Sequence, residues 1–203
     1  MRRVRFGLVM AVAAALVACA SAPGPNQGLQ PTSRTLGPFV YFEEGTDLLI
    51  TVGAQATRQR PDTPFFPIEI GIANKSHEKV ITITREAFSV TVGDSREVPA
   101  ATAAEVIEGY RALNADRVLF RSREFTATKF DRYAQPAVES RFYPNSQRRT
   151  GVVQERVELG SGTYFQDVLY FRNPGFSLKG QVVSLLVRLK AGEDPHVVVF
   201  KLD

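Results

Sequence analysis

The stretch "FFPIEIGIANKS", residues 65–76, decides the fold class of this chain. Glu69 and Lys75 fall on one side of it, and apolar side chains occupy every second position on the other: Phe66, Ile68, Ile70 and Ile72. Alternation with a period of two is typical of a β-strand that buries one face. The stretch therefore predicts a strand followed by a polar turn at "NKSHEK".

The same alternation recurs in segments on both sides of this strand. In residues 47–58 the predicted buried face comprises Leu48, Ile50, Val52, Ala54 and Ala56, and the polar face includes Thr51. Further segments are 80–84, 87–94, 152–159, 163–171, 182–190 and 196–202. Seven to nine short strands separated by turn residues predict an all-β fold, an antiparallel immunoglobulin-like β-sandwich, over residues 39–203.

An insertion interrupts the strands at about residues 100–149. It begins with helical spacing from a start near Thr102 or Pro99, at Ala103, Val106, Tyr110 and Leu113. Gly109 weakens a long helix, so we expect one or two short ones. A loop-like stretch rich in aromatic residues and arginines follows.

The residue types of this insertion suggest a binding surface, because aromatic residues and arginine dominate interface hot spots. We expect one partly exposed patch that engages a protein partner, formed by Tyr110, Phe130, Arg132, Tyr133 and Tyr143. The alternative is that these aromatic rings close one end of the sandwich and the arginines form its solvated rim.

The N-terminus has the layout of an export signal. Arg2, Arg3 and Arg5 precede an apolar run, Phe6 to Val17, of 12 residues, which is short of the ~20 that a transmembrane helix needs. The run ends in Leu16-Val17-Ala18-Cys19, which resembles the lipobox of bacterial lipoprotein precursors. The alternative is an ordinary signal peptide that is cleaved near Ala22, with Cys19 discarded.

The lipobox resemblance implies that Cys19 accepts a diacylglycerol and becomes the acylated N-terminus of the mature protein. Residues 1–18 are then a signal peptide, and residues 19–38, rich in Pro, Gly and Ser, a flexible tether. Ala20 follows the cysteine where an Asp would retain the protein at the inner membrane. We therefore expect a lipid anchor in the outer membrane, facing the periplasm.

The net charge bears on which partners are expected, and the number of cysteines on whether a disulfide can form. Removing Arg2, Arg3 and Arg5 from a net charge of +4 leaves +1 for the mature chain, so nucleic acid is not an expected partner. The single cysteine allows no internal disulfide.

The layout of the body also resembles the telokin-like immunoglobulin-fold domains of secreted bacterial lipoproteins. The resemblance rests on "IANKS", "KVITI", "FSVTVGD" and "YFQDVLYF" in this order. It implies the same fold and contains no catalytic motif.

Motifs for chemistry are few. His77 and His196 lack a second ligand at a recognised spacing, so no metal or other cofactor is predicted. Asp167 shares a face with apolar residues, and we expect it to meet an arginine or a backbone amide. The sequence favours a non-catalytic interaction or assembly module. The alternative is an envelope enzyme that acts on cell-wall or glycan substrates through carboxylates such as Asp131, Glu139 and Asp167.

The substitution Cys19→Ser tests the anchor. Because the hydroxyl cannot take the thioether-linked diacylglycerol, we expect the protein to leave the membrane fraction or to accumulate as the unprocessed precursor. Membrane fractionation and the mass of the N-terminal peptide measure this. A variant that stays membrane-bound with an unchanged N-terminus would refute the lipoprotein assignment.

Overall fold

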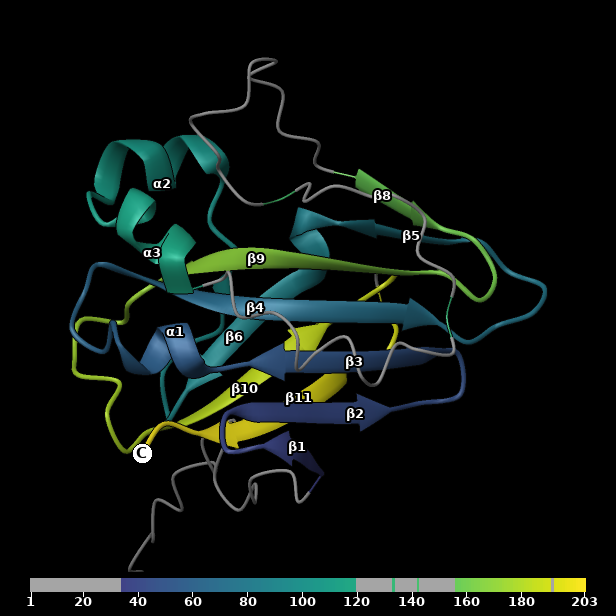
Figure 1. Ribbon diagram of the computed structural model, residues 1–203, viewed down its shortest axis with the longest axis horizontal. Coiled ribbons are helices and arrows are strands. Elements are labelled where there is room, and N and C mark those ends of the chain that lie inside the picture. Colours follow the sequence, from purple (N-terminus) through teal and green to yellow (C-terminus); the bar gives the residue numbers. More distant parts are fainter. Residues whose placement is uncertain (1–33, 120–132, 134–141, 143–155, 191) are drawn as a thin grey trace, which may run out of the picture.

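The computed structural model describes residues 34–119, 133, 142, 156–190 and 192–203. Within these residues eleven strands form three antiparallel sheets (Figure 1). The chain is therefore an all-β sandwich, as the alternation predicts. All eight predicted strand segments contain a strand, and β1, β2 and β7 are additional ones.

The larger sheet has the strand order β1-β2-β3-β4-β9. Its strands are β1 (Thr35–Gly37), β2 (Val40–Glu44), β3 (Leu48–Gly53), β4 (Phe65–Asn74) and β9 (Tyr164–Arg172). The longest is β4, with 10 residues. It pairs with β3 and β9, so that Ile70 lies opposite Val52 on one side and Asp167 on the other.

The second sheet, in the order β11-β10-β6-β7, crosses behind the first in Figure 1. Its strands are β6 (Phe88–Val92), β7 (Val98–Pro99), β10 (Val182–Val187) and β11 (His196–Lys201). A separate ribbon pairs β5 (Ile81–Thr84) with β8 (Arg156–Leu159). A 3₁₀ turn, η1 (Arg85–Ala87), leads from β5 into β6.

The main core lies between the two sheets. Ile50, Ile70 and Phe165 from the larger sheet pack in one cluster with Val90 and Leu185 from the smaller one. All five side chains are almost completely buried. Burial of such a side chain contributes roughly 1.5–3 kcal/mol, so this cluster supplies much of the driving force for folding.

The larger sheet is buried on its outer face as well, so the prediction of one buried face is wrong for β3 and β4. Leu49, Thr51, Glu69 and Ala73 point away from the main core, yet all are buried. At one end of this outer face a second apolar cluster joins the sheet to the helices: Ala56, Phe65, Ala101, Val106, Tyr110, Leu113, Val168 and Tyr170.

Three short helices contribute to this outer cluster: α1 (Gln55–Arg58), α2 (Ala103–Gly109) and α3 (Leu113–Leu119). They gather at the left-hand end of the molecule in Figure 1. The pair α2 and α3 confirms the predicted short helices. Gly109 is needed because a Cβ there would lie 2.9 Å from Cε2 of Phe65.

Two predicted boundaries differ from the structure. Strand β3 ends at Gly53, and the predicted strand residue Ala56 belongs to α1, which turns its side chain into the outer cluster. The fold also starts before residue 39, because β1 at Thr35–Gly37 pairs with β2 inside the predicted tether. The β1 segment has few apolar side chains, and its backbone pairing places it in the sheet.

The start of α2 provides a test of local structure. Thr102 accepts a hydrogen bond from the backbone N–H of Glu105, whose side chain accepts from the N–H of Thr102. Loss of such a cap costs about 1 kcal/mol. We expect Thr102→Ala to lower the free energy of unfolding in urea by this amount and Thr102→Ser to change it little. Equal stability of the three proteins would show that the cap contributes nothing.

Candidate functional site

A buried carboxylate organises the end of the sandwich where the helices lie. Asp116 of α3 is fully buried. Its Oδ2 accepts hydrogen bonds from the hydroxyls of Tyr110, at 2.7 Å, and Tyr170, at 3.1 Å, and its Oδ1 accepts one from Nε of Arg60, at 2.9 Å. Both oxygens of Asp116 are therefore engaged, and they join α3 to β9 and to the loop after α1.

The pKa shifts around Asp116 fit a structural role. Burial, together with the hydrogen bond to Asp116 and its charge, raises the pKa of Tyr110 far above its usual value. For Arg60 burial lowers the pKa, but the charges and hydrogen bonds of Asp116 and Tyr110 together outweigh burial, and the net shift is upward. Tyr110 thus stays protonated near neutral pH, where it donates a hydrogen bond and is no general base.

The prediction that Tyr110 lies in a partly exposed patch is wrong. Only 4% of Tyr110 is exposed. Its ring packs against Phe65, with centroids 6.3 Å apart, and against Tyr170, at 5.4 Å. The helical spacing of Val106, Tyr110 and Leu113 is the sequence signal for this packing, because such a stripe faces the core.

The other residues of the predicted patch do not extend this cluster within the described residues. Tyr133 is half-buried and packs on a third apolar cluster, formed by Leu49, Ala73 and Tyr164 on the outer face of the larger sheet. Phe130, Arg132 and Tyr143 lie outside the described residues, as does Cys19. Tyr110 and Tyr133 thus belong to separate clusters.

Asp167 meets backbone amides, as predicted. Its Oδ1 accepts from the N–H of Val168 at 2.7 Å, and its Oδ2 accepts from the N–H of Phe142. Asp131 and Glu139, the other two carboxylates of the enzyme alternative, lie outside the described residues. Asp167 therefore holds a segment of the insertion against β9.

Arg85 also binds the backbone of Phe142, and this role of Arg85 was not predicted from the sequence. The buried guanidinium of Arg85 donates from Nη2 to the carbonyl oxygen of Phe142 and from Nη1 to that of Ala101, both at 2.8 Å. The ring of Phe142 is fully buried between Phe88 and Phe165. The sequence gives a weak signal for the burial of Arg85. In "TITREAFS", residues 82–89, Arg85 lies two positions after Ile83, so the alternation places it on the inward face.

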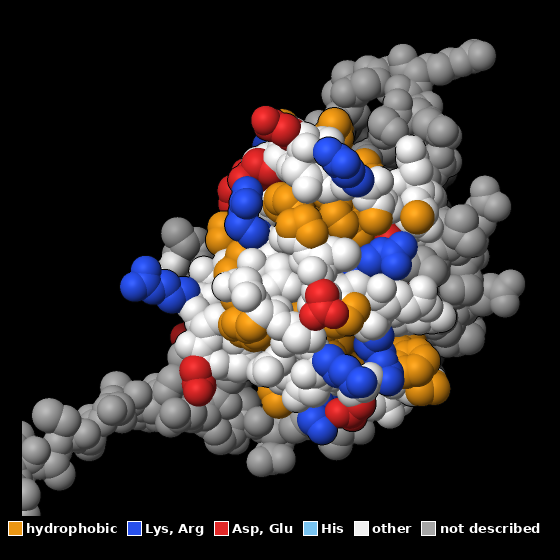
Figure 2. Space-filling view, turned by 90° about the vertical axis from the view of Figure 1, so that its left-hand side faces the viewer, with side chains coloured by type: hydrophobic (Ala, Val, Ile, Leu, Met, Phe, Trp, Pro, Cys, Tyr) orange, Lys and Arg blue, Asp and Glu red, His pale blue; other side chains and the backbone are white. Residues whose placement is uncertain are grey.

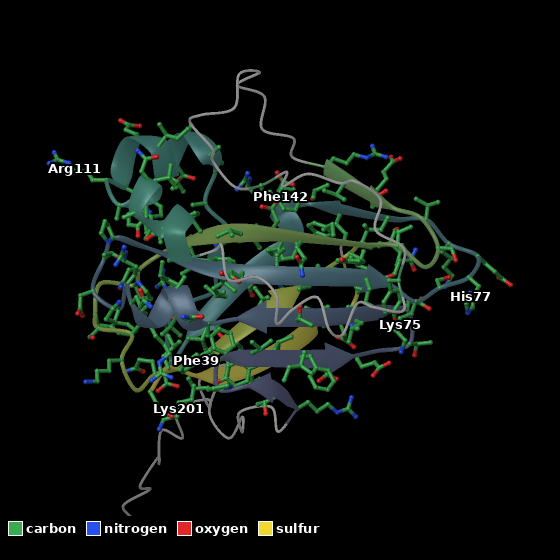
Figure 3. The ribbon with its side chains drawn as sticks, viewed as in Figure 1. Phe39, Lys75, His77, Arg111, Phe142 and Lys201 are labelled. Carbon is green, nitrogen blue, oxygen red and sulfur yellow. The ribbon has the colours of Figure 1, made fainter. Side chains whose placement is uncertain are left out.

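An open groove of about 670 Å³ is lined by residues of α1, by Phe39 and by the C-terminal residues Leu202 and Asp203; Figure 3 labels Phe39 and the neighbouring Lys201. The guanidinium of Arg58 stacks over Phe39, 4.3 Å from the ring centroid, and Lys201 pairs with Asp203 at 2.6 Å. Figure 2 looks onto the end of the molecule where the helices lie, and basic and acidic side chains are interspersed there. A groove with a stacked cation, an aromatic ring and exposed polar groups suits binding.

The two histidines lie away from this groove. Figure 3 places His77 at the opposite end of the molecule from Phe39 and Lys201. His77 is exposed in the turn between β4 and β5, and His196 begins β11. In the part of the chain that the structure describes, no three His, Cys, Asp or Glu side chains are grouped to hold a metal ion.

Comparisons with known proteins give no further guidance: no family model, no curated protein and no solved structure matches this chain. Across the described residues, none of the helices has the length and apolar character that a membrane span requires.

The Asp116 cluster generates a pH prediction. Because the folded pKa of Tyr110 is raised, its contribution to stability is complete below the unfolded pKa of about 10 and is lost as the pH rises above it. We expect Tyr110→Phe to lower the free energy of unfolding at pH 7 by roughly 1–3 kcal/mol and to make the decline above pH ~10 shallower. Urea unfolding across this pH range measures both effects.

Tyr41→Phe is the matched control. The hydroxyl of Tyr41 makes one exposed hydrogen bond of 3.3 Å, to the carbonyl oxygen of Lys201, so its loss is expected to matter less at pH 7. If Tyr110→Phe were as stable as the wild type at pH 7, the hydrogen bond from Tyr110 to Asp116 would contribute no net stability.

Proposed function

We propose that this chain is a lipid-anchored protein of the bacterial cell envelope, and that its sandwich is a non-catalytic module for interaction or assembly. The observation that carries the proposal is Leu16-Val17-Ala18-Cys19, at the end of a short apolar run that follows three arginines. With Ala20 after the cysteine, the anchor lies in the outer membrane and the sandwich faces the periplasm.

Three acyl-type chains on Cys19 would hold the protein firmly, because each buried CH₂ contributes about 0.8 kcal/mol. The first described residue, Arg34, comes 15 residues after Cys19. As a flexible coil this length averages roughly 5–6 Å × √15, or about 21 Å. The tether reaches the sandwich at β1, the edge strand of the larger sheet.

The buried polar groups support a binding role over a catalytic one. Asp116 and Asp167, both buried, accept hydrogen bonds from tyrosine hydroxyls, an arginine and backbone amides. A carboxylate that holds secondary structure together in this way is a poor acid or base, since its protonation would disrupt the fold. The Arg58–Phe39 groove, by contrast, combines an aromatic ring and a cation at an accessible surface.

Crosslinking in native membranes tests the function. We expect an amine-reactive crosslinker, followed by immunoprecipitation and mass spectrometry, to yield the same few envelope proteins in each replicate from cells that make the full chain. The matched control carries residues 1–38 of this chain fused to an unrelated domain, which keeps the anchor and tether and removes the sandwich. We expect that control to yield none of these adducts.

Adducts no more abundant than those of the control would contradict the interaction module. Hydrolysis of purified cell-wall glycan by the full chain, abolished by Asp167→Asn without a loss of folding, would replace it with the enzyme alternative.

A further inference from the structure

In the described part of the chain, the ribbon of β5 and β8 has an edge without a neighbouring strand. Within the described residues β5 pairs only with β8, and no backbone hydrogen bond joins residues 81–84 to any other described segment. Backbone N–H and C=O groups point alternately to the two sides of a strand. One side of β5 therefore presents donors and acceptors that another strand can use.

This edge lines a groove that lies beyond the end of β10. The N–H of Arg188 donates to the carbonyl oxygen of Ala87 at 2.8 Å, which continues the pairing of β10 with β6. Beyond it, Leu189 and Lys190 line the far side of a groove of about 480 Å³, and residues 79–82 line the near side. Ile81 and Thr82 are consecutive and point to opposite faces, so the groove lies along the edge of β5.

The groove combines the apolar side chains of Val80, Ile81 and Leu189 with polar ones, among them His196, and its Lys, Asp and Glu side chains form two ion pairs. Val80 is 66% exposed, the most exposed of the large hydrophobic side chains described. Lys79 pairs with Asp47 at 3.2 Å, and Lys190 pairs with Glu193 at 2.9 Å. Because these cations and acids neutralise one another, the groove favours an uncharged occupant over an anion or a metal ion.

Asn74 fixes the geometry of the edge in advance. Its fully buried side-chain amide donates to the carbonyl oxygens of Lys79, at 2.7 Å, and Leu159, at 3.0 Å, and its Oδ1 accepts from the N–H of Ser76. These bonds join the start of β5 to the end of β8. Because this edge is already ordered, it loses less conformational entropy when a segment binds to it.

We infer that the β5 groove binds an extended, uncharged peptide segment of a partner protein, which adds as a strand to β5. Main-chain hydrogen bonds supply the affinity, and alternate apolar side chains contact Val80 and Leu189. The inference rests on the proposed function and deepens it, because it names the surface and the kind of segment that the interaction module recognises.

The test uses an uncharged, capped pentapeptide of alternating threonine and valine as the probe, titrated into the purified full chain in detergent. We expect saturable NMR shifts in residues 79–82 and 189–190 at millimolar peptide. The same peptide with every backbone nitrogen methylated keeps its side chains and lacks donors, and we expect it to produce none of these shifts.

Val80→Asp is the test variant and Ile107→Asp is its matched control. Both side chains are more than half exposed, at 66% and 54%, and Ile107 lies on α2, away from the groove. We expect Val80→Asp to weaken peptide binding at least tenfold and Ile107→Asp to leave it within twofold of the wild type. Folding of each variant is checked by its melting temperature.

The inference would be overturned if the peptide gave no saturable shifts in β5, if the methylated peptide bound equally well, or if Val80→Asp bound the peptide as well as the wild type does. Concentration-dependent shifts at β5 without peptide would also overturn it, by identifying a second copy as the occupant. If Val80→Asp lost peptide binding but kept every membrane crosslink, this inference would fail and the proposed function would stand. If the wild type gave no specific crosslinks, the proposed function itself would fail.

Discussion

The burial of β4 on both faces is the constraint on which the rest of the structure depends. Its inner side chains, such as Ile70, face the second sheet, and its outer residues Glu69 and Ala73 are buried as well. A strand buried on both sides needs a second layer of cover, and α1, α2 and α3 supply it at one end. The insertion is therefore part of the packed fold, at least where Phe142, Tyr110 and Tyr133 contact the sheets.

Charged groups that enter this interior serve to attach segments. Asp116 joins α3 to β9, whereas Asp167 and Arg85 hold Phe142 by its backbone. A buried charge is tolerated only when its hydrogen bonds are made, which explains why both oxygens of each carboxylate are engaged. These groups belong to the scaffold, and the surfaces that we propose for a partner are the groove at Arg58 and Phe39 and the groove along β5.

Alternation predicted the fold class and eight strand segments because a period of two reports directly on pleated, half-buried strands. The helical spacing predicted a helix start near Thr102 or Pro99, and α2 begins directly after Thr102. Alternation could not show that Leu49 and Ala73 are buried on the outer face, since that depends on Tyr133 and Tyr164, which are distant in the sequence. Tyr110 was wrongly assigned to an interface because aromatic residues beside arginines are typical of interfaces. Its hydrogen bond to the buried Asp116 instead holds it in the interior. The burial of Arg85 was not predicted, because arginine is usually exposed. No structure of Phe130, Arg132 or Tyr143 is described, so their part of the predicted patch stays a prediction.

The central claim is that a rigid sandwich, held at the membrane by its lipid, presents a surface to a partner. Hydrogen exchange of the full chain in native membranes, compared with the purified chain in detergent, tests it most directly. We expect the amides of β4 to exchange slowest in both preparations, and additional protection in membranes to be confined to β5 and the facing residues 189–190. Identical exchange in both preparations, or fast exchange of β4, would contradict this account.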